Sequence, residues 1–254
     1  MKTRLGLTLM ISIIILMMFF LCACDRATVT EEIYRGQEKF SPDEAERYLR
    51  ELVGDDAEKY EFTRTEYGES IRCDIIDDTN CKGGLSNQVS ITGSGEAKIQ
   101  LPCNLDDITS YGWVPDEKNT SLSQINYTYY KNKNGGRISL FGEDSSVLGL
   151  SVNIGDFSGS KKENYALIYD NQPEFDYMGI TRKSTPADVI KILGLPNEIY
   201  YSYCAWLEFK YSWFDENGLC NSLKFEWWTS ADEPEIMSEF KIRGGLTFFA
   251  DLLN

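Results

Sequence analysis

The stretch YSYCAWLEFKYSW, residues 201–213, places an apolar or aromatic side chain at every odd position and most of its polar side chains at even positions. After DENG, residues 215–218, the alternation resumes in LCNSLKFEW, residues 219–227. A period of two is typical of a β-strand with one buried face. The two runs therefore predict a β-hairpin whose odd-numbered aromatic residues form a core. These residues are Tyr201, Tyr203, Tyr211, Trp213 and Trp227.

Two registers of this hairpin keep odd positions opposite odd positions. One places Glu208 opposite Lys224, and the other places it opposite Glu226. Like charges directly opposite each other are unfavourable, so the sequence favours the pairing with Lys224. In that register Cys204 and Cys220 lie roughly 26 Å apart along the strands, at about 3.3 Å per residue. A disulfide between them is excluded, because its two Cα atoms would have to lie about 4.4–6.8 Å apart.

Short helices are expected before this hairpin and before two others. SPDEAERYLRELVG (41–54) and STPADVIKILGLP (184–196) each contain a capping Ser or Thr followed by proline, and a glycine that stops the helix. Asn104 and Gly112 enclose a third short helix, and strand-like runs follow each of the three. This recurrence predicts an α+β fold in which antiparallel β-hairpins and small sheets are each packed with a short helix, in two or three similar units.

The same features divide the chain into five predicted segments. The division follows the apolar N-terminus, a polar stretch without periodicity and the three helix–hairpin patterns. The segments are a lipoprotein signal peptide at 1–23, a tether at 24–40, an N-terminal helix–hairpin unit at 41–95, a middle αβ unit at 96–170 and a C-terminal helix–hairpin unit at 171–254.

The N-terminus has the pattern of a secretory signal. Lys2 and Arg4 form a basic start, an apolar run continues to Leu21, and LCAC follows. A cut before Cys24 leaves the small Ala23 at the cleavage site, which resembles the bacterial lipobox. We therefore expect Cys24 to carry a diacylglycerol thioether, and the mature protein to be held on the extracytoplasmic face of the cell membrane. A retained transmembrane helix is the alternative, since about 17–25 apolar residues span a bilayer, but it leaves LCAC unexplained.

Composition narrows the possible functions. Loss of Lys2 and Arg4 changes the formal net charge from −15 to −17, which disfavours nucleic-acid binding. The chain has no histidine, and this excludes Ser-His-Asp and Cys-His catalysis and histidine metal sites. No pair of cysteines has zinc-ribbon spacing, so neither a metal nor another cofactor is expected. Carboxylate and lysine chemistry stays possible.

Five cysteines follow Cys24, an odd number, so at least one is expected to be free or to pair with another molecule. Cys73 and Cys81 flank a short loop, and the sequence leaves open whether they form a disulfide. The remaining three are Cys103, Cys204 and Cys220.

Two tryptophans are the candidate partner-binding residues. Trp206 and Trp228 lie among charged residues on the face opposite the aromatic core. If they are exposed, they provide an adhesive surface for a protein, peptide or glycan. The alternative is that the middle unit covers them.

Three acidic pairs are weaker candidates for hydrolase chemistry, which needs two carboxylates about 5–10 Å apart across a cleft. Negative charge in the first turn of a helix is favourable in itself, so the pair at 106–107 has a structural explanation. The pairs are Asp55-Asp56, Asp77-Asp78 and Asp106-Asp107.

The segment GITRKSTPADVIKILGLP, Gly179 to Pro196, resembles the GMTxxEVxxxLGxP pattern that precedes the strands of BamE-like and beta-lactamase-inhibitor-like modules. Asp188 stands where those modules often have glutamate. The segment IQLPCNLDDITSYGW (99–113) is similar to one found in many uncharacterised lipoproteins of Gram-positive bacteria. The resemblance spans residues 97–229 and implies a cell-surface binding or scaffold module without catalytic residues.

The expected function is therefore a lipid-anchored, non-catalytic binding module. An inhibitor or immunity-type protein that docks through Trp206 and Trp228 is one alternative. A surface hydrolase that uses paired carboxylates is the other.

Overall fold

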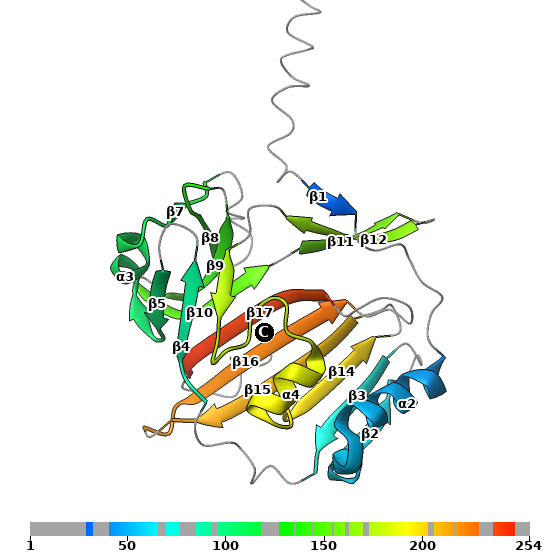
Figure 1. Ribbon diagram of the computed structural model, residues 1–254. Coiled ribbons are helices and arrows are strands. Elements are labelled where there is room, and N and C mark those ends of the chain that lie inside the picture. Colours follow the sequence, from blue (N-terminus) through cyan, green and yellow to red (C-terminus); the bar gives the residue numbers. More distant parts are fainter. Residues whose placement is uncertain are drawn as a thin grey trace, which may run out of the picture.

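The computed structural model shows one broad antiparallel sheet with helices and smaller sheets around it (Figure 1). It describes only part of the chain, in fourteen segments whose side chains are not all placed. The described residues are 29–32, 41–65, 70–76, 85–92, 96–117, 127–134, 136–143, 145–153, 155–160, 163–169, 173–202, 206–215, 217–228 and 236–246.

The broad sheet has eleven strands in the order β2-β3-β14-β15-β16-β17-β10-β9-β8-β7, and β6 pairs with β10 beside this path. The four C-terminal strands form its centre. A hairpin from the N-terminal part extends one edge, and strands from the middle part extend the other. The strands are β2 (Tyr60–Arg64), β3 (Ser70–Ile75), β6 (Cys103–Asn104), β7 (Val114–Pro115), β8 (Tyr127–Lys131), β9 (Arg137–Glu143), β10 (Ser146–Asn153), β14 (Glu198–Ser202), β15 (Trp206–Phe214), β16 (Cys220–Trp228) and β17 (Ile236–Leu246).

Two three-stranded sheets flank the broad one, in the orders β1-β12-β11 and β13-β4-β5. The second of these packs on the core of the broad sheet, because the ring of Phe175 stacks on Phe240 at a centroid distance of 4.3 Å. The strands are β1 (Val29–Glu32), β12 (Glu163–Tyr169), β11 (Gly155–Ser160), β13 (Glu174–Asp176), β4 (Gln88–Thr92) and β5 (Glu96–Gln100).

The helices form where the capping signals predict them. The described residues contain α2 (Pro42–Val53), α3 (Leu105–Ser110) and α4 (Pro186–Leu193), and a 3-10 turn, η1 (Gly54–Lys59), follows α2. Reciprocal side-chain and backbone bonds cap α2 and α4, with Ser41 and Thr185 at the caps, and at α3 the Asp107 carboxylate accepts a hydrogen bond from the backbone N–H of Asn104. In each helix the third residue is acidic, and its carboxylate accepts a hydrogen bond from the backbone N–H of the capping residue. These acidic residues are Glu44, Asp107 and Asp188.

The predicted α+β class is wrong at the level of architecture. Each helix does precede a hairpin, but the hairpins do not form separate helix-packed units. Strand β3 pairs with β14, and β17 pairs with β10, so strands from all three predicted units join one sheet. The fold is mostly antiparallel β-sheet, with three short α-helices in its described part. Strand β1 also lies inside the segment predicted to be a tether.

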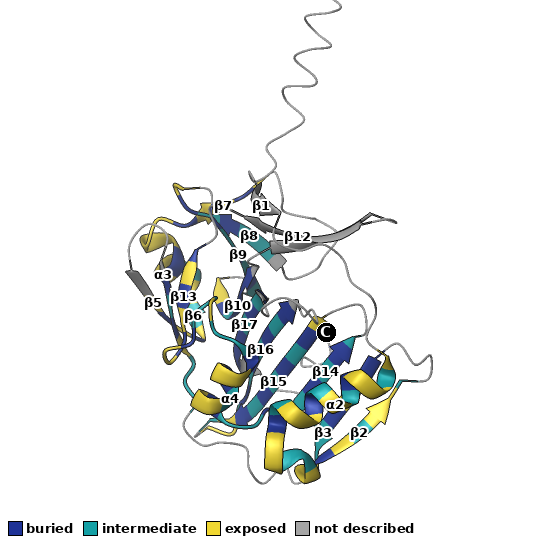
Figure 2. Cartoon of the chain, turned by 45° about the vertical axis from the view of Figure 1, so that its right-hand side comes forward, coloured by how far each residue is buried: buried dark blue, intermediate teal, exposed yellow. Residues whose placement is uncertain are grey.

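The predicted aromatic core is confirmed wherever the structure describes it. Tyr201, Tyr211, Trp213 and Trp227 are all buried, while Tyr203 lies outside the described residues. Dark blue and teal alternate along β14 to β17 in Figure 2, as expected for strands with one covered face. Helices α2 and α4 lie over this face in Figure 1.

The loop segments around α4 supply acceptors for polar atoms in the core. Trp227 donates its indole N–H to the carbonyl of Ser184 at 2.9 Å. The Tyr211 hydroxyl donates to the carbonyl of Gly194 at 2.8 Å. Because an unpaired polar atom in a core is costly, these bonds fix where the helix sits on the sheet.

The stretch 201–213 is two strands rather than one. Tyr201 lies opposite Leu207 and Ser202 opposite Trp206, so β14 and β15 form a hairpin whose connection, 203–205, lies outside the described residues. Odd positions lie opposite odd positions across this hairpin. The alternation therefore continues unbroken in the sequence although the chain reverses direction.

The predicted register of the second hairpin is also wrong. Glu208 lies opposite Glu226, and Lys210 lies opposite Lys224. The turn explains the register, because the Asp215 carboxylate accepts hydrogen bonds from the backbone N–H groups of Asn217 and Leu219, both at 2.9 Å. Turn geometry of this kind fixes the pairing of the strands that leave it.

The described cysteines are unbridged. Cys73 and Cys103 carry free thiols, and Cys73 and Cys220 are buried. A Cys73–Cys81 disulfide is therefore absent, while Cys81 and Cys204 lie outside the described residues. Burial raises the pKa of the Cys73 thiol to about 12, and nearby Asp74 adds to this shift. A thiol of this kind is unreactive at neutral pH.

Candidate functional site

The face of the broad sheet opposite the core carries a pattern of charges that repeats on three neighbouring strands. Glu208-Phe-Lys210 on β15, Lys224-Phe-Glu226 on β16 and Glu239-Phe-Lys241 on β17 lie side by side. The three phenylalanines point into the core and the charged residues point away from it. These phenylalanines are Phe209, Phe225 and Phe240.

The strand pairing turns these tripeptides into two rows of opposite charge. Glu208, Glu226 and Glu239 are directly opposite one another in one row. The adjacent row consists of the three lysines, two residues away along each strand. Diagonal neighbours on a sheet are about 7–8 Å apart at Cα, which a lysine side chain spans.

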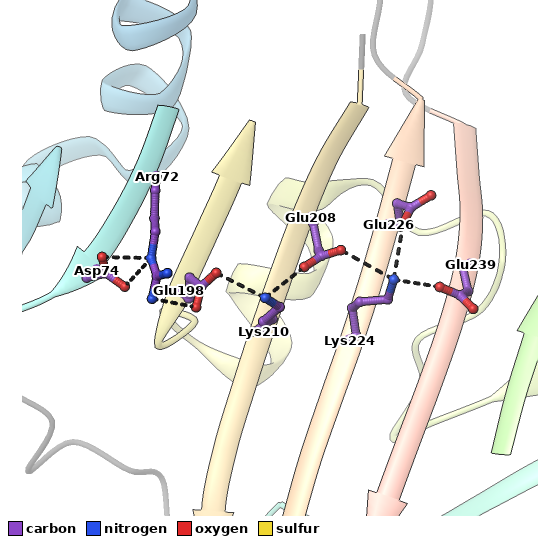
Figure 3. A network of polar contacts seen from close by, with 8 residues as sticks. All are labelled: Arg72, Asp74, Glu198, Glu208, Lys210, Lys224, Glu226 and Glu239. Atoms are coloured by element: carbon purple, nitrogen blue, oxygen red, sulfur yellow. Dashed lines mark hydrogen bonds and ion pairs between the residues drawn. The ribbon is translucent and has the colours of Figure 1, made fainter. Parts of the chain in front are cut away.

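Lys224 is at the centre of these rows (Figure 3). Its Nζ lies 3.3 Å from a carboxylate oxygen of Glu208, 3.2 Å from Glu226 and 2.6 Å from Glu239. One ammonium group therefore contacts three carboxylates on three strands. This diagonal contact compensates for the like charges placed opposite each other.

The ion pairs continue from Lys224 towards the N-terminal edge of the sheet. Lys210 lies 3.2 Å from Glu208 and 3.0 Å from Glu198. Arg72 then lies 3.1 Å from Glu198 and 2.9 Å from Asp74. We call these eight residues the charge ladder. It consists of Arg72, Asp74, Glu198, Glu208, Lys210, Lys224, Glu226 and Glu239.

The charge ladder shifts the pKa values of its own members. Burial acts to lower the pKa of Lys224, but the charges of Glu239, Glu208 and Glu226 outweigh it and raise the pKa above its usual value. Burial raises the pKa of Glu226, which is only partly offset by Lys224. For Glu239 burial is overcome by the charge and hydrogen bond of Lys224 and by the Ser151 hydroxyl, so its pKa is lowered.

The charge ladder becomes more exposed towards the N-terminal edge of the sheet. The side chain of Glu208 is 12% exposed and that of Lys224 is 22% exposed. Lys210 and Arg72 reach 45% and 53%. Trp206 is on the same face of β15 as these residues and is 41% exposed. The part of the face over β3, β14 and β15 therefore presents an indole, a guanidinium and an ammonium group to solvent.

The structure places only some of the predicted site residues. Trp206 is exposed, as a partner-binding residue requires. Trp228 lies directly opposite it in the strand pairing, but its side chain is not described. Cys24 lies outside the described residues.

The acidic pairs do not converge where they are described. Asp55 and Asp56 lie in η1, Asp106 and Asp107 lie in the first turn of α3, and the pair at 77–78 is outside the described residues. A groove of about 510 Å³ beside α2 is lined by other acids, two of which, Asp43 and Glu46, are paired with an arginine. Arg64 lies 2.6 Å from Asp43 and 3.1 Å from Glu46 in that groove.

The charge ladder itself is the feature that sequence reasoning missed. The triplets EFK, KFE and EFK at 208–210, 224–226 and 239–241 were the available signal. Their order reverses from strand to strand, as an antiparallel sheet requires if like residues are to align. The preference for opposite charges in directly paired positions predicts a different register, in which these triplets do not align.

The charged groups of this face are paired with one another. Each carboxylate of the charge ladder contacts a cation within it, and Lys224 is held in its charged form. A charged amine is not a nucleophile. Within the part of the chain that the structure describes, no group of acidic and cysteine side chains has the arrangement of a metal site.

Comparison with protein-family models, curated proteins and solved structures finds no match for this chain. The resemblance to BamE-like modules therefore stays a prediction. Among the described residues, no helix has the length and apolar character needed to cross a membrane.

Proposed function

We propose that the protein is a non-catalytic binding module, anchored by lipid at Cys24 to the extracytoplasmic face of a bacterial cell membrane. Its partner is a protein that docks on the exposed part of the charged face, with Trp206 as the main contact residue. The exposure of Trp206 on the same face of the sheet as Arg72 and Lys210 supports this proposal. Tryptophan and arginine are the residues most enriched where interfaces concentrate their binding energy.

The ion pairing of the charge ladder favours binding over catalysis. The carboxylates of Glu208, Glu226 and Glu239 all surround Lys224. A hydrolase needs an acid and a base that are free to exchange protons with a substrate in a cleft. A face of fixed charges that are held in ion pairs instead provides specificity and orientation for a partner.

The lipid anchor is tested by replacing Cys24. Cells that express the wild-type chain and are fed a clickable palmitate analogue should label the protein and retain it in the membrane fraction. Cys24→Ala should lose the label and remain as an unprocessed precursor, because the thiol that accepts the lipid is absent. Equal labelling of the two proteins would disprove the anchor.

The docking surface is tested by replacing Trp206. Trp206→Ala should weaken capture of the partner from solubilised membranes about 30-fold or more, as for an interface residue worth about 2 kcal/mol or more. Phe214→Ala is the matched control, because Phe214 is an exposed aromatic residue on the same face of the same strand. Urea unfolding should give both variants the stability of the wild type.

If Trp206→Ala and Phe214→Ala weaken capture of the partner equally, or if neither weakens it, docking through Trp206 is contradicted. If a glycan released from the captured material competes for binding, the ligand is a carbohydrate and not a protein.

A further inference from the structure

The predicted tether is interrupted by a strand. Residues 24–40 were expected to link lipid to fold, but Val29–Glu32 forms β1, which pairs with β12. Only five residue steps separate Cys24 from Val29. An extended chain spans at most about 3.6 Å per residue, so β1 lies within about 18 Å of the lipid-bearing residue. Without β1, the reach from Cys24 to Ser41 would be about 60 Å.

The sheet that contains β1 has a fixed place on the molecule. Strand β12 also pairs with β11, and β11 begins at Gly155, two positions after β10 ends at Asn153. Asn153 lies opposite Glu239 near the start of β17. The β1-β12-β11 sheet therefore continues from the end of the broad sheet at which β10 stops and β17 starts.

Trp206 lies at this same end. It is the first residue of β15 and is opposite Trp228, the last residue of β16, which is opposite Ile236 at the start of β17. Three strand spacings, about 14 Å, separate β15 from β10. In Figure 1 the arrows of β14 and β16 point towards this end, and the β1-β12-β11 sheet lies beyond it.

The opposite end of the broad sheet is far from the anchor. Phe214 ends β15, eight residues after Trp206, and is therefore about 26 Å away at 3.3 Å per residue. The turn that holds Asp215 lies beyond Phe214, and η1 lies at the same end, because it leads into β2 at Tyr60 opposite Ile75.

We infer that the protein stands on the membrane with a defined end towards the bilayer, namely the β1-β12-β11 sheet and the strand ends that carry Trp206. The partner that docks at Trp206 is then a protein embedded in the same membrane. This inference rests on the proposed function, because it requires the lipid at Cys24. The short connection from Cys24 to β1 limits how far this sheet can lie from the bilayer. The strand topology determines which end of the broad sheet faces the bilayer.

The orientation is measured with a fluorescent amino acid at position 206 or position 214 of the lipidated full-length chain. Each protein is reconstituted into vesicles of phosphatidylethanolamine and phosphatidylglycerol that carry a quencher on the lipid headgroups. Emission from position 206 should be quenched several-fold more than emission from position 214. Equal quenching, or stronger quenching at position 214, would overturn the orientation.

Two insertions separate the role of β1 from that of the tether. A flexible insert of about ten Gly and Ser residues between Arg26 and Ala27 lengthens the chain before β1, and should abolish the difference between the two positions. The same insert between Gly36 and Gln37 lies after β1 and should leave the difference intact. Identical effects of the two inserts would show that β1 does not hold the molecule.

The partner class is tested by a photo-crosslinking amino acid at position 202, directly opposite Trp206, or at position 214, in native membranes. An adduct with an integral membrane protein at position 202, absent at position 214, is the expected result. Adducts with lipid alone or with a soluble protein would overturn the partner class. A failure of the anchor is seen separately, since the protein would then not bind vesicles at all.

Discussion

Replacing Lys224 by methionine should lower the free energy of unfolding by about 2–4 kcal/mol at neutral pH. Removing one partner of a fully buried ion pair costs about 3–5 kcal/mol, and the 22% exposure of this side chain reduces the loss. Methionine has a similar length and fills the same space. The loss comes from the three glutamates that remain on the face without their shared cation. Urea unfolding with a fixed m-value measures it.

Lys210→Met is the matched control for this substitution. Lys210 lies directly opposite Lys224 and also contacts two glutamates, but its side chain is 45% exposed. Exposed ion pairs contribute about 0–1 kcal/mol, so this variant should lose no more than that. Equal losses for the two variants would contradict the central role of Lys224.

The deficit of Lys224→Met should shrink as the pH falls. In the wild type, the lowered pKa of Glu239 gives stability that is lost on acidification, and the raised pKa of Glu226 acts in the opposite direction. Without Lys224, the folded-state pKa values of Glu226 and Glu239 should both rise above their unfolded values, because burial then acts without the opposing charge. Protonation then stabilises the folded variant relative to the wild type.

The two proteins should therefore differ less at about pH 4.5, close to the ordinary pKa of glutamate, than at neutral pH. Adding Glu226→Gln to Lys224→Met should restore part of the stability at neutral pH, because one uncompensated charge is removed. A deficit that stays constant with pH would show that lost packing, and not charge, causes it.

Phe225→Ala should have a comparable or larger effect, with a loss of about 3–5 kcal/mol. Phe225 is completely buried on the central strand of the broad sheet. Its ring lies 5.5 Å from that of Phe240, 5.9 Å from Trp227 and 6.3 Å from Tyr211, measured between centroids. The substitution would leave a cavity among large, rigid rings that cannot move to fill it. The midpoint of urea unfolding measures the loss.

Phe214→Ala is the control for this core substitution. Phe214 is on the neighbouring strand but is 55% exposed, so the loss should stay within about 0.5 kcal/mol. A small loss at Phe225 would mean that the aromatic face is not the core of the folded protein.

The local elements of this fold are readable from the sequence. Ser41 and Thr185 begin helices because a side-chain oxygen satisfies a backbone N–H that would otherwise be unpaired. The strand-like runs that follow the first two helices form the hairpins β2–β3 and β8–β9. Both signals depend only on residues within a few positions of each other.

The candidate site was only half predictable. Trp206 stands out because a large aromatic residue occupies the polar face of an alternating strand. The charge ladder does not stand out, because its members come from five strands. A rule for directly opposite pairs even favoured the wrong register. That rule fails because Lys224 reaches diagonally to Glu208 and Glu239 on both neighbouring strands, and along its own strand to Glu226.

By itself, the sequence determined where the helices begin and end, which face of each strand is buried, and the aromatic content of the core. Only the tertiary structure decided that β3 lies beside β14, that β17 lies beside β10, and that β1 joins a sheet instead of remaining a tether. The physical reason is that every strand edge offers the same row of N–H and C=O groups. Side-chain order fixes a strand's faces, whereas its neighbours are selected by the packing of the whole molecule.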